Sequence, residues 1–182
     1  MGKEHFVFGE LTDFITGKTI PDTDDERDRQ KMAAYLVQDK GFLKTDIEPG
    51  VKLPVAIDDD SDTVTIDFVV QVRGRVVMIV KYGPGSIVSR ERPALSAARL
   101  LESYIIPYII ITNGRDVVIM DGRSGKPIDK GFEKIPSKSE IESRLETLEF
   151  PALEEERAEK EKRILFCMEV LSNRDCECDR TC

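Results

Sequence analysis

Two residues with the potential for joint chemistry, Asp67 and Lys81, lie in consecutive apolar segments of the stretch 63–82. A lone acid and a lone lysine inside apolar strands are costly unless a partner or a reaction uses them. Metal-dependent phosphodiester cleavage uses this pair, because a carboxylate binds magnesium and a lysine lies near the attacking water. Such sites carry a second carboxylate two residues before the lysine, where this chain has Ile79.

Both residues are predicted to lie on adjacent strands of a hairpin. Residues 64–72 alternate as a half-buried strand does, and Arg73-Gly74-Arg75 indicates a turn. Residues 76–81 are apolar until their end, which predicts a central strand covered on both faces. Strand parity then directs Ile79 and Lys81 toward the same side.

Each residue also has a purely structural interpretation. Asp67 could pair with Arg73 or Arg75 across the hairpin, and Lys81 could extend from a strand end into solvent. We favour the site interpretation for both, because an acid between Ile66 and Phe68 needs a partner.

Helices are predicted around this hairpin, so the expected fold is a mixed α/β sheet. Thr23 and Glu26 fit a capping box that starts a helix ending near 40–41, and Ser137 and Glu140 fit a second one. The remaining expected elements are a strand at 51–57, a helix at 89–104, a hairpin at 108–120 about Asn113-Gly114, and a helix at 153–173. The expected organisation is a lead-in (1–22), an α/β domain (23–136), a C-terminal helical extension (137–173) and a cysteine-rich tail (174–182).

Composition restricts the class of protein. Of 182 residues, 40% are hydrophobic and 34% charged, and no run is long enough to span a membrane, so we expect a folded cytoplasmic protein. The net charge of −8 argues against coating nucleic acid by bulk charge. A local basic cleft remains compatible with it, because arginines cluster around the candidate site.

Several segments together resemble a known family. They are DERDRQKMAAYLVQDKGF (25–42), the connection at 41–48, IDFVV (66–70), RGRVVMIVK (73–81) and IIITNGRDVVIM (109–120). With these segments the chain resembles the N-terminal nuclease domain of type I restriction enzyme R subunits. The resemblance implies a restriction-endonuclease-like PD-(D/E)xK fold, in which helices flank a mixed central sheet.

The resemblance also implies roles for particular residues. Asp67 would be the metal-binding acid, Lys81 the motif lysine and Glu26 the acid from the first helix. Glu48 would be a weaker candidate acid, and the Val80 carbonyl a further metal ligand. Glu26 could instead act only as a helix cap, and Glu48 could be an ordinary loop acid.

Ile79 departs from the family pattern, and magnesium demands hard oxygen ligands. Glu91 or Glu102 from the following helix could replace the missing acid, or the remaining ligands could suffice for one ion. Otherwise the site binds without cutting.

Three arginines after Gly83-Pro84-Gly85, namely Arg90, Arg92 and Arg99, are candidates for phosphate contacts. An ordinary solvated helix face explains them equally well.

The cysteines lie at the C-terminal end and do not fit a standard metal site. Their spacing matches neither paired zinc motifs nor ferredoxin runs, so we favour a reactive tail over zinc or iron–sulfur binding. They are Cys167, Cys176, Cys178 and Cys182.

The first hypothesis is therefore a Mg²⁺- or Mn²⁺-dependent endonuclease, with DNA as the substrate that the resemblance implies. The alternative is an inactive module of the same fold that binds nucleic acid, or that binds a protein partner or a second copy through residues 151–182.

Overall fold

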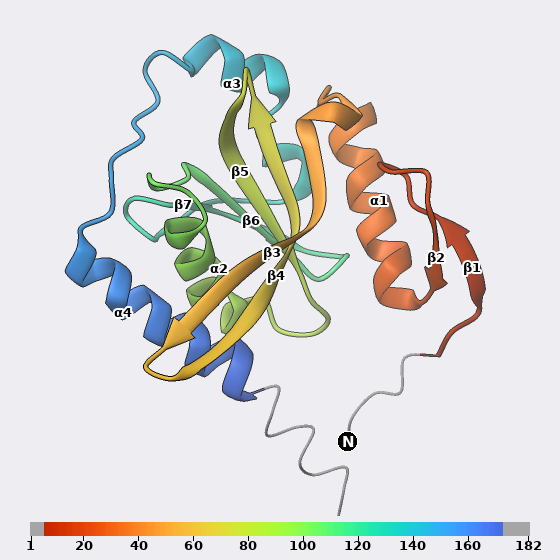
Figure 1. Cartoon of the computed structure of the whole chain (residues 1–182). Helices are drawn as coiled ribbons and strands as arrows, with labels where there is room; N and C mark the ends of the chain where they lie inside the picture. The colour runs from red at the N-terminus through yellow and green to blue at the C-terminus, as the bar shows by residue number, and fades with distance from the viewer. Residues whose placement is uncertain (1–5, 173–182) are drawn as a thin grey trace, which may run out of the picture.

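The computed structural model describes residues 6–172, which form a six-stranded mixed sheet, a separate two-stranded sheet and four α-helices (Figure 1). The large sheet has the order β3-β4-β5-β6-β7-β8, and only its β5–β6 pair is parallel. The strands are β1 (Gly9–Thr12), β2 (Thr19–Asp22), β3 (Ile47–Ile57), β4 (Asp60–Val72), β5 (Arg75–Tyr82), β6 (Tyr108–Thr112), β7 (Val117–Asp121) and β8 (Pro127–Lys130).

Helices cover both faces of the sheet. Helix α2 connects the parallel strands β5 and β6, which cannot be joined by a tight turn. Helices α2 and α4 lie against one face and α1 against the other (Figure 1). The helices are α1 (Asp24–Gln38), α2 (Val88–Leu100), α3 (Lys138–Arg144) and α4 (Glu155–Leu165), which a π-helical turn, η3 (Phe166–Leu171), extends. The expected mixed α/β fold with a C-terminal helix is confirmed.

The core consists of two apolar clusters, one on each face of the sheet. Strand β5 belongs to both, and its residues 77–80 are completely buried, as expected for a central strand. The even-numbered residues of β4 change cluster at Asp67: Ile66 packs with α2 and α4 and Phe68 with α1, while Val69 packs in the same cluster as Ile66. Asp67 therefore lies between the two β4 residues, Ile66 and Phe68, that pack on opposite faces of the sheet.

The predicted β4–β5 turn is a two-residue hairpin loop. Arg73 and Gly74 both have positive φ, 51° and 75°. Two consecutive residues of this kind match the right-handed twist of the strands they connect. The turn sets the register as far as Gln71 opposite Val76, and a bulge between Val70 and Gln71 then shifts it by one residue, so that Phe68 lies opposite Val80.

The start of α1 differs from the expected capping box in one respect. Thr23 caps the helix, accepting a hydrogen bond from the Glu26 backbone N–H at 3.1 Å. The Glu26 carboxylate accepts instead from Arg29 and Gln30. The capping box at Ser137 and Glu140 is complete.

Other boundaries also differ from expectation. The expected N-terminal lead-in contains the β1–β2 hairpin, β8 was not predicted, and α2 ends at Leu100 rather than Tyr104. The C-terminal helix starts at Glu155, and Ser172 ends its described part. Within residues 6–172, no helix combines the length and apolar character that crossing a bilayer would require.

Candidate active site

A cleft of about 550 Å³ opens where β4 and β5 separate. Seven elements and the β1–β2 turn contribute to its walls. The pairing of β4 with β5 ends at Phe68 and Val80. Beyond this pair the two strands separate, and residues of β4 before Phe68 and of β5 after Val80 line the cleft. Its charged side chains are four acids and four bases: Asp13, Glu26, Asp67 and Glu169, with Lys18, Arg29, Lys81 and Arg90.

Asp67 is held by groups on two elements. Its Oδ2 accepts from the Tyr82 backbone N–H at 2.7 Å, and its Oδ1 accepts from Arg29 Nε at 2.8 Å. The first bond satisfies the backbone N–H of Tyr82, which has no β4 backbone partner because the two strands have diverged at this point. The sequence suggested Arg73 or Arg75 as the ion-pair partner of Asp67, but the partner is Arg29 of α1.

Lys81 crosses the gap between the same strands. Its ammonium donates to the Thr65 carbonyl oxygen at 2.7 Å and lies 3.6 Å from Glu169 Oε2. The residue is only 7% exposed, so it does not extend freely into solvent. Glu169 belongs to η3, and it therefore brings a carboxylate from the C-terminal helix to the motif lysine.

Glu26 and Arg29 form the α1 side of the cleft. Arg29 Nη1 donates to Glu26 Oε2 at 3.0 Å, while Gln30 Nε2 donates to Glu26 Oε1 at 2.8 Å. Gln30 also donates to Asp13 in the β1–β2 turn, which fixes that hairpin against α1. Burial alone would lower the pKa of Arg29, but its attraction to Asp67 and Glu26 raises that pKa, so the guanidinium stays charged.

Tyr82 connects the cleft to the start of α1. Its hydroxyl donates to Asp25 Oδ1 at 2.9 Å, and the guanidinium of Arg29 lies 5.2 Å from its ring centroid. Burial, followed by the hydrogen bond to Asp25, raises the pKa of the Tyr82 hydroxyl above its usual range. Tyr82 is therefore a protonated structural group that orients Asp67 through its backbone N–H.

Two residues of the sequence-based motif lie away from the cleft. Ile79 is completely buried in the apolar cluster beneath α2, with Val69 and Ile109 as neighbours. Val80 is buried in the opposite cluster, paired on one side with Phe68 and on the other with Ile110. Neither residue lines the cleft.

An acid placed at position 79 is therefore expected to destabilise the fold rather than complete the site. Ile79→Glu should cost at least about 3 kcal/mol in the free energy of unfolding, because it buries an unpaired charge. The matched Ile79→Val change should cost about 0.5–1.5 kcal/mol. Urea unfolding measures both. If Ile79→Glu were as stable as Ile79→Val, this placement of the side chain would be wrong.

The other candidate acids do not join the site. Glu48 lies in β3 rather than in a loop, is exposed and lines a neighbouring depression. Glu91 lies in the first turn of α2 and Glu102 just beyond its C-terminal end, and both lie outside the cleft. Besides Asp67 and Glu26, two carboxylates that were not predicted line the cleft, Glu169 and Asp13.

The three candidate arginines have different positions. Arg90 lines the cleft and donates to the Pro84 carbonyl oxygen, packing where any side chain at Gly83 would collide with it. Its Nε is buried and has no partner among the described residues. Arg92 and Arg99 bind Glu161 of α4 and lie outside the cleft, so they connect helices, which accounts for them without a phosphate.

Glu161 attaches the C-terminal helix to the domain. It is completely buried, and its carboxylate accepts from Arg99 and Ser96, each at 2.7 Å. Burial alone would raise its pKa, but hydrogen bonds from Arg92, Ser96 and Arg99 lower the pKa to about 2. The apolar residues Leu165, Phe166 and Val170 of the same helix pack into the core. Glu169 is thus carried on an anchored element.

The side chains present fit a hard cation in type, since carboxylates are the ligands that magnesium prefers. Asp67, Glu26 and Glu169 could hold such an ion. In this structure, however, Arg29 lies between Glu26 and Asp67 and donates a hydrogen bond to each. Within the described part of the chain, no three acidic, histidine or cysteine side chains are close enough together to hold an ion as they stand. Binding would therefore require side-chain movement.

The cysteine tail lies almost wholly outside the described residues. Cys167 is a free, exposed thiol on η3. Cys176, Cys178 and Cys182 are beyond residue 172.

A family model described as type I restriction enzyme R protein N terminus (HSDR_N) matches residues 24–136, which is more than half of the chain. The matched segment contains Glu26, Arg29, Asp67 and Lys81, whereas Glu169 lies beyond its end. Searches of curated proteins and of solved structures found no match.

Proposed function

Because the chain belongs to the type I restriction enzyme R N-terminal family, we propose that it is a metal-dependent endonuclease that cleaves DNA in the β4–β5 cleft. One observation carries this proposal: Asp67 and Lys81 line a single cleft with two further carboxylates, Glu26 and Glu169. An active site of this class requires such convergence on one small volume. Glu169 replaces the charge that Ile79 cannot provide.

In this proposal Asp67, Glu26 and Glu169 hold a magnesium or manganese ion. The bound ion would polarise the phosphodiester group and lower the pKa of a water molecule. Lys81, fixed by Thr65 and Glu169, would support the negative charge that develops on the phosphate. Arg90, on the same cleft wall, would contact a neighbouring phosphate.

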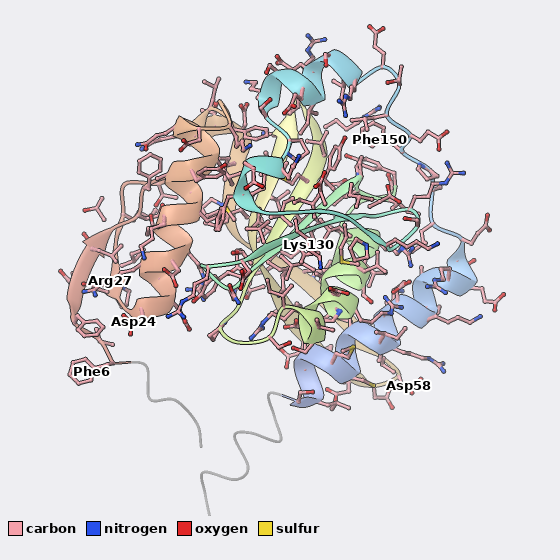
Figure 2. The ribbon with its side chains drawn as sticks, turned by 180° about the vertical axis from the view of Figure 1, so that it is seen from behind. Phe6, Asp24, Arg27, Asp58, Lys130 and Phe150 are labelled. Atoms are coloured by element: carbon pink, nitrogen blue, oxygen red, sulfur yellow. The ribbon has the colours of Figure 1, made fainter. Side chains whose placement is uncertain are left out.

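Replacing Lys81 tests the proposal. Lys81→Ala should reduce the rate of plasmid or single-stranded DNA cleavage in Mg²⁺ or Mn²⁺ by on the order of 10²-fold, because the ammonium no longer stabilises the transition state. Lys130→Ala is the matched control: Lys130 also ends a strand, but it is exposed and lies outside the cleft (Figure 2). Equal cleavage by both variants would refute the role of Lys81.

A second candidate function is binding without hydrolysis. It is favoured by Arg29, which already neutralises the two principal acids, and by the burial of Ile79. In that case DNA should bind as tightly in EDTA as in the presence of a divalent metal ion, and no metal ion should produce cleavage. A protein partner bound to the C-terminal helix is less favoured, because most apolar side chains of the described part of this helix pack against its own domain. Met168 and Leu171 are the exceptions and are partly exposed.

A further inference from the structure

We propose that Arg29 is an internal cation that occupies the place of the metal ion between Glu26 and Asp67, and that metal binding must displace it. This inference rests on the proposed function and concerns how its site is regulated. In this inference Arg29 competes with the metal ion for the two acids and does not itself bind the ion.

All four carboxylate oxygens of the two acids already have donors. Arg29 supplies one donor to each acid, at 2.8 Å to Asp67 and 3.0 Å to Glu26. The Tyr82 N–H and the Gln30 amide supply the other two. Each carboxylate oxygen keeps a further lone pair, but the Arg29 guanidinium lies between the two acids, so a magnesium ion that bridges both must displace it.

The charge of Arg29 also opposes the ion. An arginine guanidinium is always protonated in proteins, and this one contacts both acids. An ion that binds Glu26 and Asp67 must therefore displace one positive charge or lie beside it, and either costs binding free energy. The affinity of the resting site for metal is consequently low.

The Arg29 side chain borders open space in the cleft, into which it can move. Its side chain is 32% exposed, and it borders the cleft rather than the core. A planar guanidinium binds phosphate as readily as carboxylate. A DNA phosphate entering the cleft offers Arg29 a new partner, which frees the two acids. Metal binding would then be favoured once substrate is present.

Manganese binding to the full-length chain tests the inference. The dissociation constant for Mn²⁺, from calorimetry and from the electron paramagnetic resonance signal of free Mn²⁺, is compared among wild type, Arg29→Met and Arg27→Met. Arg29→Met should bind Mn²⁺ roughly tenfold or more tightly than wild type, because the competing charge is gone. Arg27 is the matched control on the same helix, since it pairs with Asp22 outside the cleft; its variant should match wild type.

Loss of Arg29 leaves two carboxylates without their counter-ion, so metal-free Arg29→Met should have a lower melting temperature. Mn²⁺ should then raise that temperature more in the variant than in wild type. Arg29→Gln, which keeps a hydrogen-bond donor without the charge, should also bind Mn²⁺ more tightly and serves if the methionine variant does not fold. Unchanged Mn²⁺ affinity in the folded variants would overturn the inference.

The two proposals fail separately. Absence of cleavage by wild type, with tighter Mn²⁺ binding in Arg29→Met, would remove the endonuclease but retain the internal cation. Cleavage by wild type, with unchanged Mn²⁺ affinity in the variants, would do the reverse.

Discussion

Asp67→Asn should reduce metal-dependent DNA cleavage by on the order of 10³-fold, the largest effect on activity that we expect from a single substitution. Asparagine preserves the shape of the side chain, and its carbonyl oxygen can still accept the Tyr82 N–H. It removes the negative charge that would hold the metal ion. Initial rates of plasmid cleavage in Mg²⁺ and in Mn²⁺, with circular dichroism to check the fold, measure the effect.

Asp59→Asn provides the matched control for this change. Asp59 is exposed in the β3–β4 turn, next to Asp58 (Figure 2), and lies outside the cleft. Its cleavage rate should equal that of wild type. DNA affinity in EDTA should be similar in all three proteins, because Asp67 contributes to metal binding rather than to phosphate binding. Wild-type rates in Asp67→Asn would contradict the account.

Glu161→Ala should destabilise the protein by about 3–5 kcal/mol, because it leaves buried arginine charge unpaired. Three arginines, Arg92, Arg99 and Arg157, direct their guanidinium groups at this one carboxylate. Since Glu161 connects α4 to α2, its loss should also release the helix that carries Glu169 and reduce cleavage. Urea unfolding measures the change in stability.

Glu159→Ala is the control on the same helix, because Glu159 forms only an exposed pair with Lys162. It should change stability by no more than about 1 kcal/mol. The pKa of Glu161, lowered to about 2 from an ordinary value of 4.5, also predicts a pH dependence. The stability that Glu161 contributes is fully present above about pH 5 and is lost as the pH falls toward 2. A Glu161→Gln variant should lose less stability over this interval; equal acid sensitivity would contradict the assignment.

Local signals in the sequence were sufficient to predict the hairpin that carries Asp67 and Lys81. The Arg73-Gly74 turn sets the register as far as Gln71 opposite Val76; the bulge between Val70 and Gln71, which then shifts the register by one residue, was not predicted. The Thr23 cap was also predicted, since capping depends on neighbours within one turn. The β1–β2 hairpin was missed because each of its strands is only four residues long.

The remaining site residues depend on long-range packing. Arg29 was visible at i+3 from Glu26, but nothing local showed that it would also reach Asp67 on β4. Ile79 shares strand parity with Lys81, yet the separation of β4 from β5 puts the two in different surroundings. Glu161 has the pattern of a solvated helix acid, and only docking on α2 makes it buried. Glu169 reaches Lys81 for the same reason.

The most direct test of the account is the position of a metal ion in crystals of the protein grown with both Mn²⁺ and a short DNA duplex, because DNA phosphate is expected to draw Arg29 away from the two acids. Anomalous scattering from manganese locates the ion independently of the protein coordinates. The account predicts an anomalous peak in the β4–β5 cleft about 2.1 Å from an Asp67 oxygen, with the Arg29 guanidinium moved away from it. Crystals that contain Mn²⁺ elsewhere, or none, while Arg29 still bridges Glu26 and Asp67, would contradict the claim that this cleft is a metal-dependent active site.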